Sequence, residues 1–87
     1  MKKKTNIDDA ISYWNLHVRK EGEPKMDRMI FGLLFFGSHS ETTINAAKIS
    51  KMESGLRDLR NDEILRINKI TGYPLEKIQT YVQDHND

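Results

Sequence analysis

The spacing of the apolar residues constrains the fold of this chain more than any other feature of its sequence. In the first segment these residues recur at positions i, i+3, i+4, i+7 and i+11, as Ile7, Ala10, Ile11, Trp14 and Val18. That spacing places all of them on one face of a helix. Helical spacing returns in the later segments, whereas no stretch has the alternation and turn residues of a convincing β-hairpin. The sequence therefore predicts an all-α fold.

Glycine, proline and helix-capping residues divide the chain into five expected helices. We expect them over residues 7–20, 25–36, 42 or 45 to 54, 61–71 and 74–84. Asn6 and Asn61 have side chains that suit an N-cap, and Pro74 suits a first helical turn. Gly55 suits the left-handed residue beyond a helix end, and Gly72 is expected to end the fourth helix. The predicted architecture is a compact five-helix bundle.

The length of 87 residues fits a single domain that spans the whole chain. Within residues 1–87 we expect a basic, disordered start at 1–5, an extra or first helix at 7–20 and a helical core at 25–84. The apolar segment from Met26 to Phe36 is expected to place its phenylalanines in the core, as is Trp14. One or two of the phenylalanine rings could instead pack in a dimer interface, since exposed apolar patches mark partner surfaces.

Composition and charge exclude some classes of protein and leave others open. The formal net charge is +1, which excludes neither a nucleic-acid nor a protein partner. The chain has no cysteine, and Lys2–Lys4 lead into acidic residues rather than into the apolar run of a signal peptide. The most apolar run, Met29–Gly37, is much shorter than the roughly 20 residues that cross a bilayer. We therefore expect a cytoplasmic protein with no membrane partner.

One continuous stretch, Lys48 to Ile78, carries a recognisable pattern. It begins with the run ISKMESG at Ile49–Gly55, continues with an apolar helical stripe at Ile64–Gly72 and ends with YPLEKI at Tyr73–Ile78. This order of features resembles the second half of the repressor-and-Cro-type (Xre-like, lambda-repressor-like) helix-turn-helix domains. The resemblance implies a DNA-binding bundle of that type.

The resemblance also implies which residues face DNA. A recognition helix lies in the major groove with its N-terminal residues at base edges. The expected DNA-binding residues are Asn45, Ala46, Ala47, Lys48, Ser50, Lys51, Arg57 and Arg60. The basic members would contact phosphates, Ser50 a base or a phosphate, and the two alanine methyls a thymine methyl. Glu53 is expected to have a structural role, in holding the following loop or a neighbouring basic residue.

The first half of the chain departs from the family pattern. An ungapped alignment puts His39 and Thr42 where the first helix of the motif has apolar residues. The apolar helix from Met26 to Phe36 is therefore expected to take the place of that first helix. The turn that follows it, Gly37–Glu41, is then longer than usual.

The function expected from these features is that of a sequence-specific double-stranded DNA-binding transcriptional regulator. It would be a repressor or Cro-like switch of a phage or mobile element, and it would bind as a homodimer. The alternative is a helical protein-interaction module, such as an inhibitor, anti-repressor or antitoxin-like protein, that kept the fold. We expect no enzyme, cofactor or metal: His17, His39 and His85 lack ligand spacing, and Ser38-His39-Ser40 lacks a nucleophile elbow.

Overall fold

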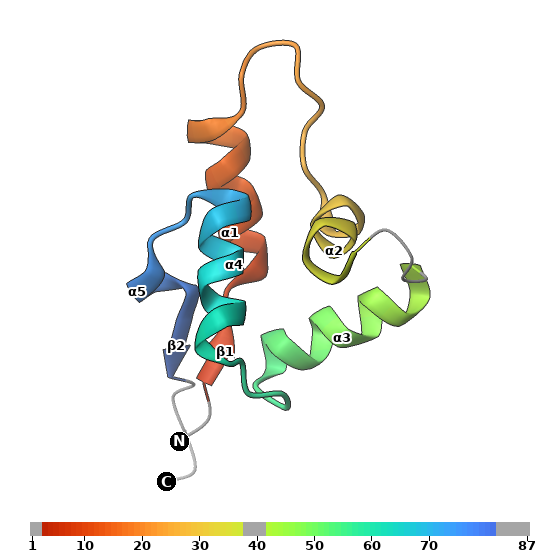
Figure 1. Ribbon diagram of the computed structural model, residues 1–87, viewed down its shortest axis with the longest axis vertical. Helices are drawn as coiled ribbons and strands as arrows, with labels where there is room; N and C mark the ends of the chain where they lie inside the picture. Colours follow the sequence, from red (N-terminus) through yellow and green to blue (C-terminus); the bar gives the residue numbers. More distant parts are fainter. Residues whose placement is uncertain (1–2, 38–41, 82–87) are drawn as a thin grey trace, which may run out of the picture.

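The computed structural model describes residues 3–37 and 42–81, and this part of the chain is mostly helical, as predicted (Figure 1). Its elements are β1 (Lys3–Thr5), α1 (Ile7–Tyr13), the π-helical η1 (Trp14–Val18), α2 (Arg28–Phe36), α3 (Thr42–Ser54), α4 (Asn61–Thr71), α5 (Leu75–Ile78) and β2 (Gln79–Tyr81). Helices α1 and α4 pack against each other, and α2 packs against both of them and against α3. None of the described helices has the length and apolar character needed to span a membrane.

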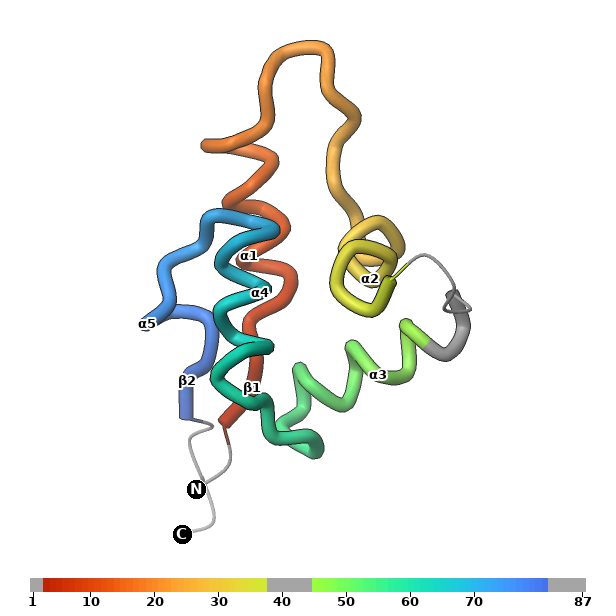
Figure 2. The backbone as a smooth tube through the Cα atoms, viewed as in Figure 1, coloured from red at the N-terminus to blue at the C-terminus, as the bar shows by residue number. Residues whose placement is uncertain are grey.

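A small antiparallel sheet joins the two ends of the described chain, which corrects the all-α prediction (Figure 2). Lys3 pairs with Tyr81, and Thr5 pairs with Gln79. The expected disordered start is therefore wrong for residues 3–5. The expected helix at 74–84 is also wrong beyond Ile78, while Val82 lies outside the described residues. Each strand is three residues long, and the two lie more than 70 residues apart in sequence. No local sequence pattern therefore predicts them.

The hydrophobic core lies where α1, α2, α3 and α4 meet. Its buried residues are Ile7, Ala10, Ile11, Met26, Phe31, Phe35, Ile49, Met52, Ile67 and Ile78. The core position predicted for the phenylalanines is confirmed, because Phe31 and Phe35 are buried and Phe36 packs against the cluster, as Trp14 does. Val18 is 44% exposed, contrary to its place on the first stripe. The π-helical turn of η1 changes the helical period there and rotates the last residues of the stripe away from the core.

The connection between η1 and α2 is an extended loop that is fastened to η1 at Asn15. The Asn15 side chain accepts a hydrogen bond from the Met26 backbone N–H at 2.7 Å and donates one to the Met26 carbonyl at 2.9 Å. Because both backbone groups of Met26 are used in this way, the helix expected from residue 25 starts at Arg28 instead. Asp27 is its N-cap, and the carboxylate accepts from the Ile30 N–H at 2.8 Å.

The helix ends agree with the glycine predictions better than with the N-cap predictions. Gly55 and Gly72 have φ of 79° and 76°, and Gly72 follows α4 in the left-handed conformation. The N-cap of α4 is Arg60 rather than Asn61, because the Glu63 carboxylate accepts the Arg60 backbone N–H at 3.0 Å. Asn6 is the N-cap residue of α1, as predicted, but its side chain makes no capping hydrogen bond.

The side chain of Asn6 is directed to the other end of the chain. Its amide donates to the Lys77 carbonyl at 2.8 Å and to the Thr80 hydroxyl at 3.3 Å. The contacts of Asn6 thus link the start of α1 to α5 and β2.

Pro74 lies at the N-cap of α5 rather than inside its first turn.

Candidate nucleic-acid interface

Helix α3 has one buried face and one exposed face. Asn45, Ile49 and Met52 are buried at spacings of four and three residues, which defines the face toward the core. The exposed side chains of this helix include those of Ala46, Ala47, Lys48, Ser50 and Lys51. The structure therefore brings together, on one helix and away from the core, five of the residues that the sequence predicted to face DNA.

The crossing of α2 over α3 is close at Gly32. A Cβ atom at Gly32 would lie 3.3 Å from the Asn45 Cβ and 3.4 Å from the Ile49 Cδ1, tighter than an ordinary van der Waals contact. The absence of a side chain at this position lets the two helices approach. The apolar helix α2 thus packs against the upstream half of α3.

An ion pair ties α3 to α2 near the C-terminal end of α3. The Arg28 guanidinium donates to the two Glu53 carboxylate oxygens at 2.6 and 2.7 Å and to Asp8 at 3.0 Å. The hydrogen bond to Glu53 raises the pKa of Arg28 above its ordinary value; burial acts in the opposite direction, and Asp8 adds to the rise. The prediction that Glu53 holds a basic residue is confirmed, and its partner lies on another helix.

The prediction that Asn45 faces DNA is wrong. Asn45 is only 3% exposed and lies on the face of α3 that packs against Gly32. Its spacing from Ile49 and Met52 would have placed it on the buried face, but its polar side chain and its position early in the helix favoured the opposite prediction.

Arg57 and Arg60 differ in how far they are free to reach a partner. The Arg57 guanidinium donates to the Glu63 carboxylate at 2.6 Å, and the Glu63 side chain is only 5% exposed. Arg57 is therefore held against α4, because its departure would remove the closest ionic partner of a buried carboxylate. Arg60 has a side chain that is 73% exposed and lies 3.3 Å from the Asp62 carboxylate. Exchange of such an exposed ion pair costs little, so Arg60 can reach toward a phosphate.

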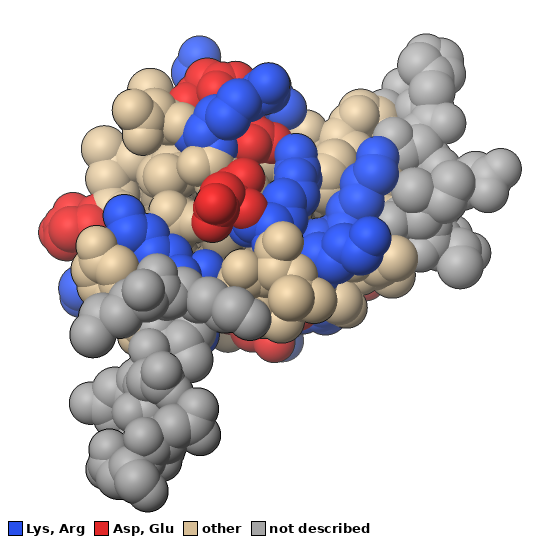
Figure 3. Space-filling view, turned by 90° about the horizontal axis from the view of Figure 1, so that it is seen from below, with Lys and Arg blue, Asp and Glu red and all other residues tan. Residues whose placement is uncertain are grey.

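Basic side chains occupy several parts of the face of the molecule seen in Figure 3, and acidic side chains lie among them. On α3 the Lys48 ammonium lies 5.1 Å from the centre of the Phe36 ring, a cation–π distance. Strand β1 contacts α3, and its Lys3 and Lys4 are exposed. Lys4 lines the same surface pocket as Glu53. The sequence showed the basic start of the chain but not its position beside α3.

Comparisons with protein-family models, with curated proteins and with solved structures found no match for this chain. Within residues 3–37 and 42–81, no group of three His, Cys, Asp or Glu side chains is placed to hold a metal ion. Ser38, His39 and Ser40 lie outside the described residues.

Proposed function

We propose that this protein binds double-stranded DNA in a sequence-specific manner and regulates transcription, with α3 in the major groove. The observation that carries the proposal is the exposed face of α3, where small and basic side chains stand opposite a buried apolar face. An α-helix with its side chains is about 10–12 Å across, and the major groove is about 12 Å wide. Small residues at the centre of this face let the helix backbone approach the base edges.

The exposed residues of α3 divide into two roles. Ala46, Ala47 and Ser50 would lie against base edges, where methyl groups contact thymine and a hydroxyl donates or accepts. Lys48 and Lys51 would contact phosphates, with Arg60 as a further basic contact. Arg57 would support the loop after α3 through Glu63 rather than bind DNA itself.

The regulatory mechanism that we propose is occlusion of a promoter by a bound homodimer. Two-fold proteins of the helix-turn-helix class read half-sites about one helical turn apart. The resemblance of residues 48–78 to repressor-and-Cro-type domains supports this part of the proposal.

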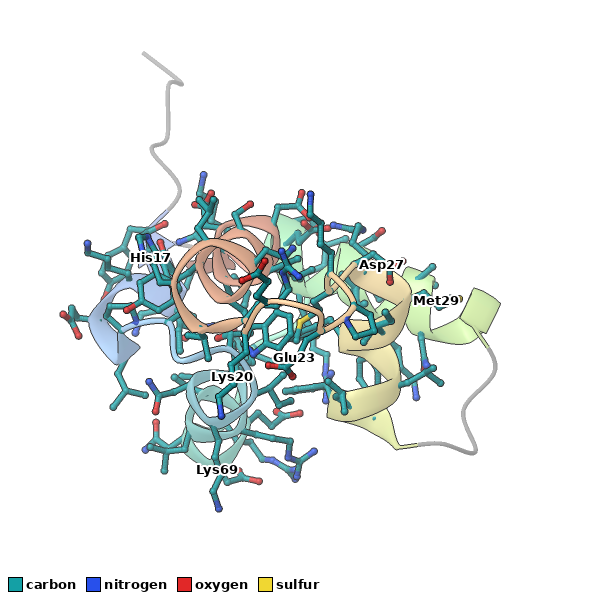
Figure 4. The ribbon with its side chains drawn as sticks, turned by 90° about the horizontal axis from the view of Figure 1, so that it is seen from above. His17, Lys20, Glu23, Asp27, Met29 and Lys69 are labelled. Carbon is teal, nitrogen blue, oxygen red and sulfur yellow. The ribbon has the colours of Figure 1, made fainter. Side chains whose placement is uncertain are left out.

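Fluorescence anisotropy with a labelled random-sequence duplex tests the proposal, at about 50 and 200 mM salt. Wild-type protein is compared with Lys48→Ala/Lys51→Ala, which removes two charges from α3. The matched control is Lys20→Ala/Lys69→Ala, which removes two exposed charges from the region seen in Figure 4, away from the exposed face of α3. We expect wild-type and control proteins to bind alike and to lose affinity steeply with salt, and the α3 variant to bind weakly at both salts.

The second candidate function is a helical protein-interaction module. It is favoured by two exposed apolar side chains on α2: Met29 is 54% exposed and Leu34 is 55% exposed. A folded wild-type protein that fails to bind the duplex even at low salt would contradict the DNA proposal and support this one.

A further inference from the structure

A small cavity lies between α2 and the upstream half of α3. Its volume is about 140 Å³, and its walls are Arg28, Met29, Asn45, Ala46 and Ile49 (Met29 is labelled in Figure 4). One water molecule takes about 30 Å³ of the liquid, so the cavity has room for a molecule of a few non-hydrogen atoms. It is separate from the exposed face of α3 considered above, except that Ala46 borders both.

The wall of the cavity contains the buried side-chain amide of Asn45. Neither the amide nitrogen nor the amide oxygen of Asn45 has a hydrogen-bond partner among the described residues, and the side chain is 3% exposed. A buried donor and acceptor without partners lose their hydration and gain nothing in return. Such groups in folded proteins are normally satisfied by protein, by ordered water or by a ligand.

A second asparagine of the same chain shows the usual arrangement. The amide of Asn15 uses its oxygen and its nitrogen together, on the backbone N–H and carbonyl of Met26. The partner of Asn15 is thus a donor and an acceptor presented side by side. The amide of Asn45 has the same donor and acceptor and borders a space into which such a partner fits.

The other residues of the cavity wall indicate how polar and how charged the ligand can be. Met29, Ala46 and Ile49 are apolar, and the charge of Arg28 is already balanced by Glu53 and Asp8. A neutral ligand therefore suits the cavity better than an anion. We propose that this cavity binds small neutral molecules that carry a primary carboxamide on a short apolar body. The ligand amide pairs with the Asn45 amide through one donated and one accepted hydrogen bond, and the body contacts Met29 and Ile49.

The test is an NMR titration of the ¹⁵N-labelled full chain with isobutyramide. The matched control ligand is 3-methyl-2-butanone, which has the same branched body and carbonyl but a methyl group in place of the amide nitrogen. We expect isobutyramide to shift the side-chain amide signals of Asn45 and the backbone signals of Met29 and Ala46, with saturation in the millimolar range that suits so small a ligand. No shift with isobutyramide, or equal shifts with the ketone, would overturn the proposal.

A pair of matched variants and one further variant keep the test independent of folding. Ala46→Leu fills the cavity from an exposed position, and Ala47→Leu places the same side chain at a neighbouring exposed position that is not part of the wall. We expect Ala46→Leu to abolish the isobutyramide shifts and Ala47→Leu to retain them. Asn45→Leu, if folded by circular dichroism, should also lose them. Retention of the shifts in Ala46→Leu would contradict the assignment of the ligand to this cavity. The outcome does not depend on whether the protein binds DNA.

Discussion

At the scale of single residues, charged and polar side chains decide how α3 is held. The carboxylate of Glu53 binds both terminal nitrogens of Arg28, and the carboxylate of Glu63 binds Arg57 and the backbone N–H of Arg60. Each of these carboxylates is less exposed than its arginine partner. The C-terminal end of α3 and the loop that follows it are therefore tied to α2 and α4.

Glu53→Gln tests the tie between α2 and α3. The substitution keeps the shape of the side chain and removes its charge, so the hydrogen bonds to Arg28 weaken. We expect the free energy of unfolding in urea to fall by about 1–2 kcal/mol. Asp62→Asn is the control, because it removes a carboxylate from an exposed ion pair whose side chains are 73% and 61% exposed. Equal effects of the two substitutions would contradict the structural role of Glu53.

Tyr73 makes the free energy of unfolding depend on pH in the alkaline range. Burial raises the pKa of Tyr73 above its ordinary value of about 10, and the charge of Asp9 adds to the rise. The unfolded chain then loses this proton at a lower pH than the folded one. The stabilisation is present below about pH 10 and is lost as the pH rises through the folded pKa. In the Tyr73→Phe variant, we expect the free energy of unfolding to fall less steeply above about pH 10 than in the wild type. Identical curves of unfolding free energy against pH for the two proteins would contradict this prediction.

At the scale of elements, Gly72 determines how α4 ends and what lies against that end. Its φ is 76°, and a Cβ there would lie 3.1 Å from the Val18 Cγ2 of η1. Gly72→Ala therefore adds both backbone strain and a close contact, and we expect a loss of about 1–3 kcal/mol. Gly22→Ala is the matched control: its φ is 91°, and no described atom lies within 4 Å of the added Cβ. A smaller loss at Gly72 than at Gly22, in thermal or urea unfolding, would show that the contact with Val18 is unimportant.

The sequence predicted the helices well where local rules decide them. Glycines with positive φ end α3 and α4, and apolar periodicity locates α1, α2 and α4. It failed where a distant residue competes for the backbone, as Asn15 does at Met26, and where the pattern changes period, as at η1. The short strands were missed because each is stabilised by a partner at the far end of the chain.

The candidate interface was predictable to a similar extent. The pattern of residues 48–78 predicted a helix in this region, and the structure places Lys48 and Lys51 on the exposed side of α3. Asn45 was misplaced because residue type alone does not reveal burial. The ion pair of Arg57 with Glu63 could not be predicted from the sequence pattern either. Strand β1 lies close to α3 because the sheet holds it there, and no local sequence pattern predicts the sheet.

At the scale of the whole molecule, the two ends of the described chain are joined. The Asn6 backbone N–H donates to the Ile78 carbonyl at 2.8 Å, next to the bonds that its side chain makes. We expect Asn6→Ala to lower the free energy of unfolding by about 1 kcal/mol and to speed amide exchange at Lys4 and Thr80, which pair next to it in the sheet. Ser12→Ala, at an exposed position of α1, serves as control. Unchanged exchange in Asn6→Ala would show that the strands hold without this side chain.

We propose that the exposed face of α3 is a DNA-binding surface. The most direct measurement is an NMR titration of the ¹⁵N-labelled protein with a short duplex at about 50 mM salt, a concentration that preserves phosphate contacts. The account predicts that the largest amide shifts fall at Ala46–Lys51 and at Lys3 and Lys4, with little change in η1 or α5. Shifts confined to α2 and the loop before it, or no shifts at all, would contradict the claim.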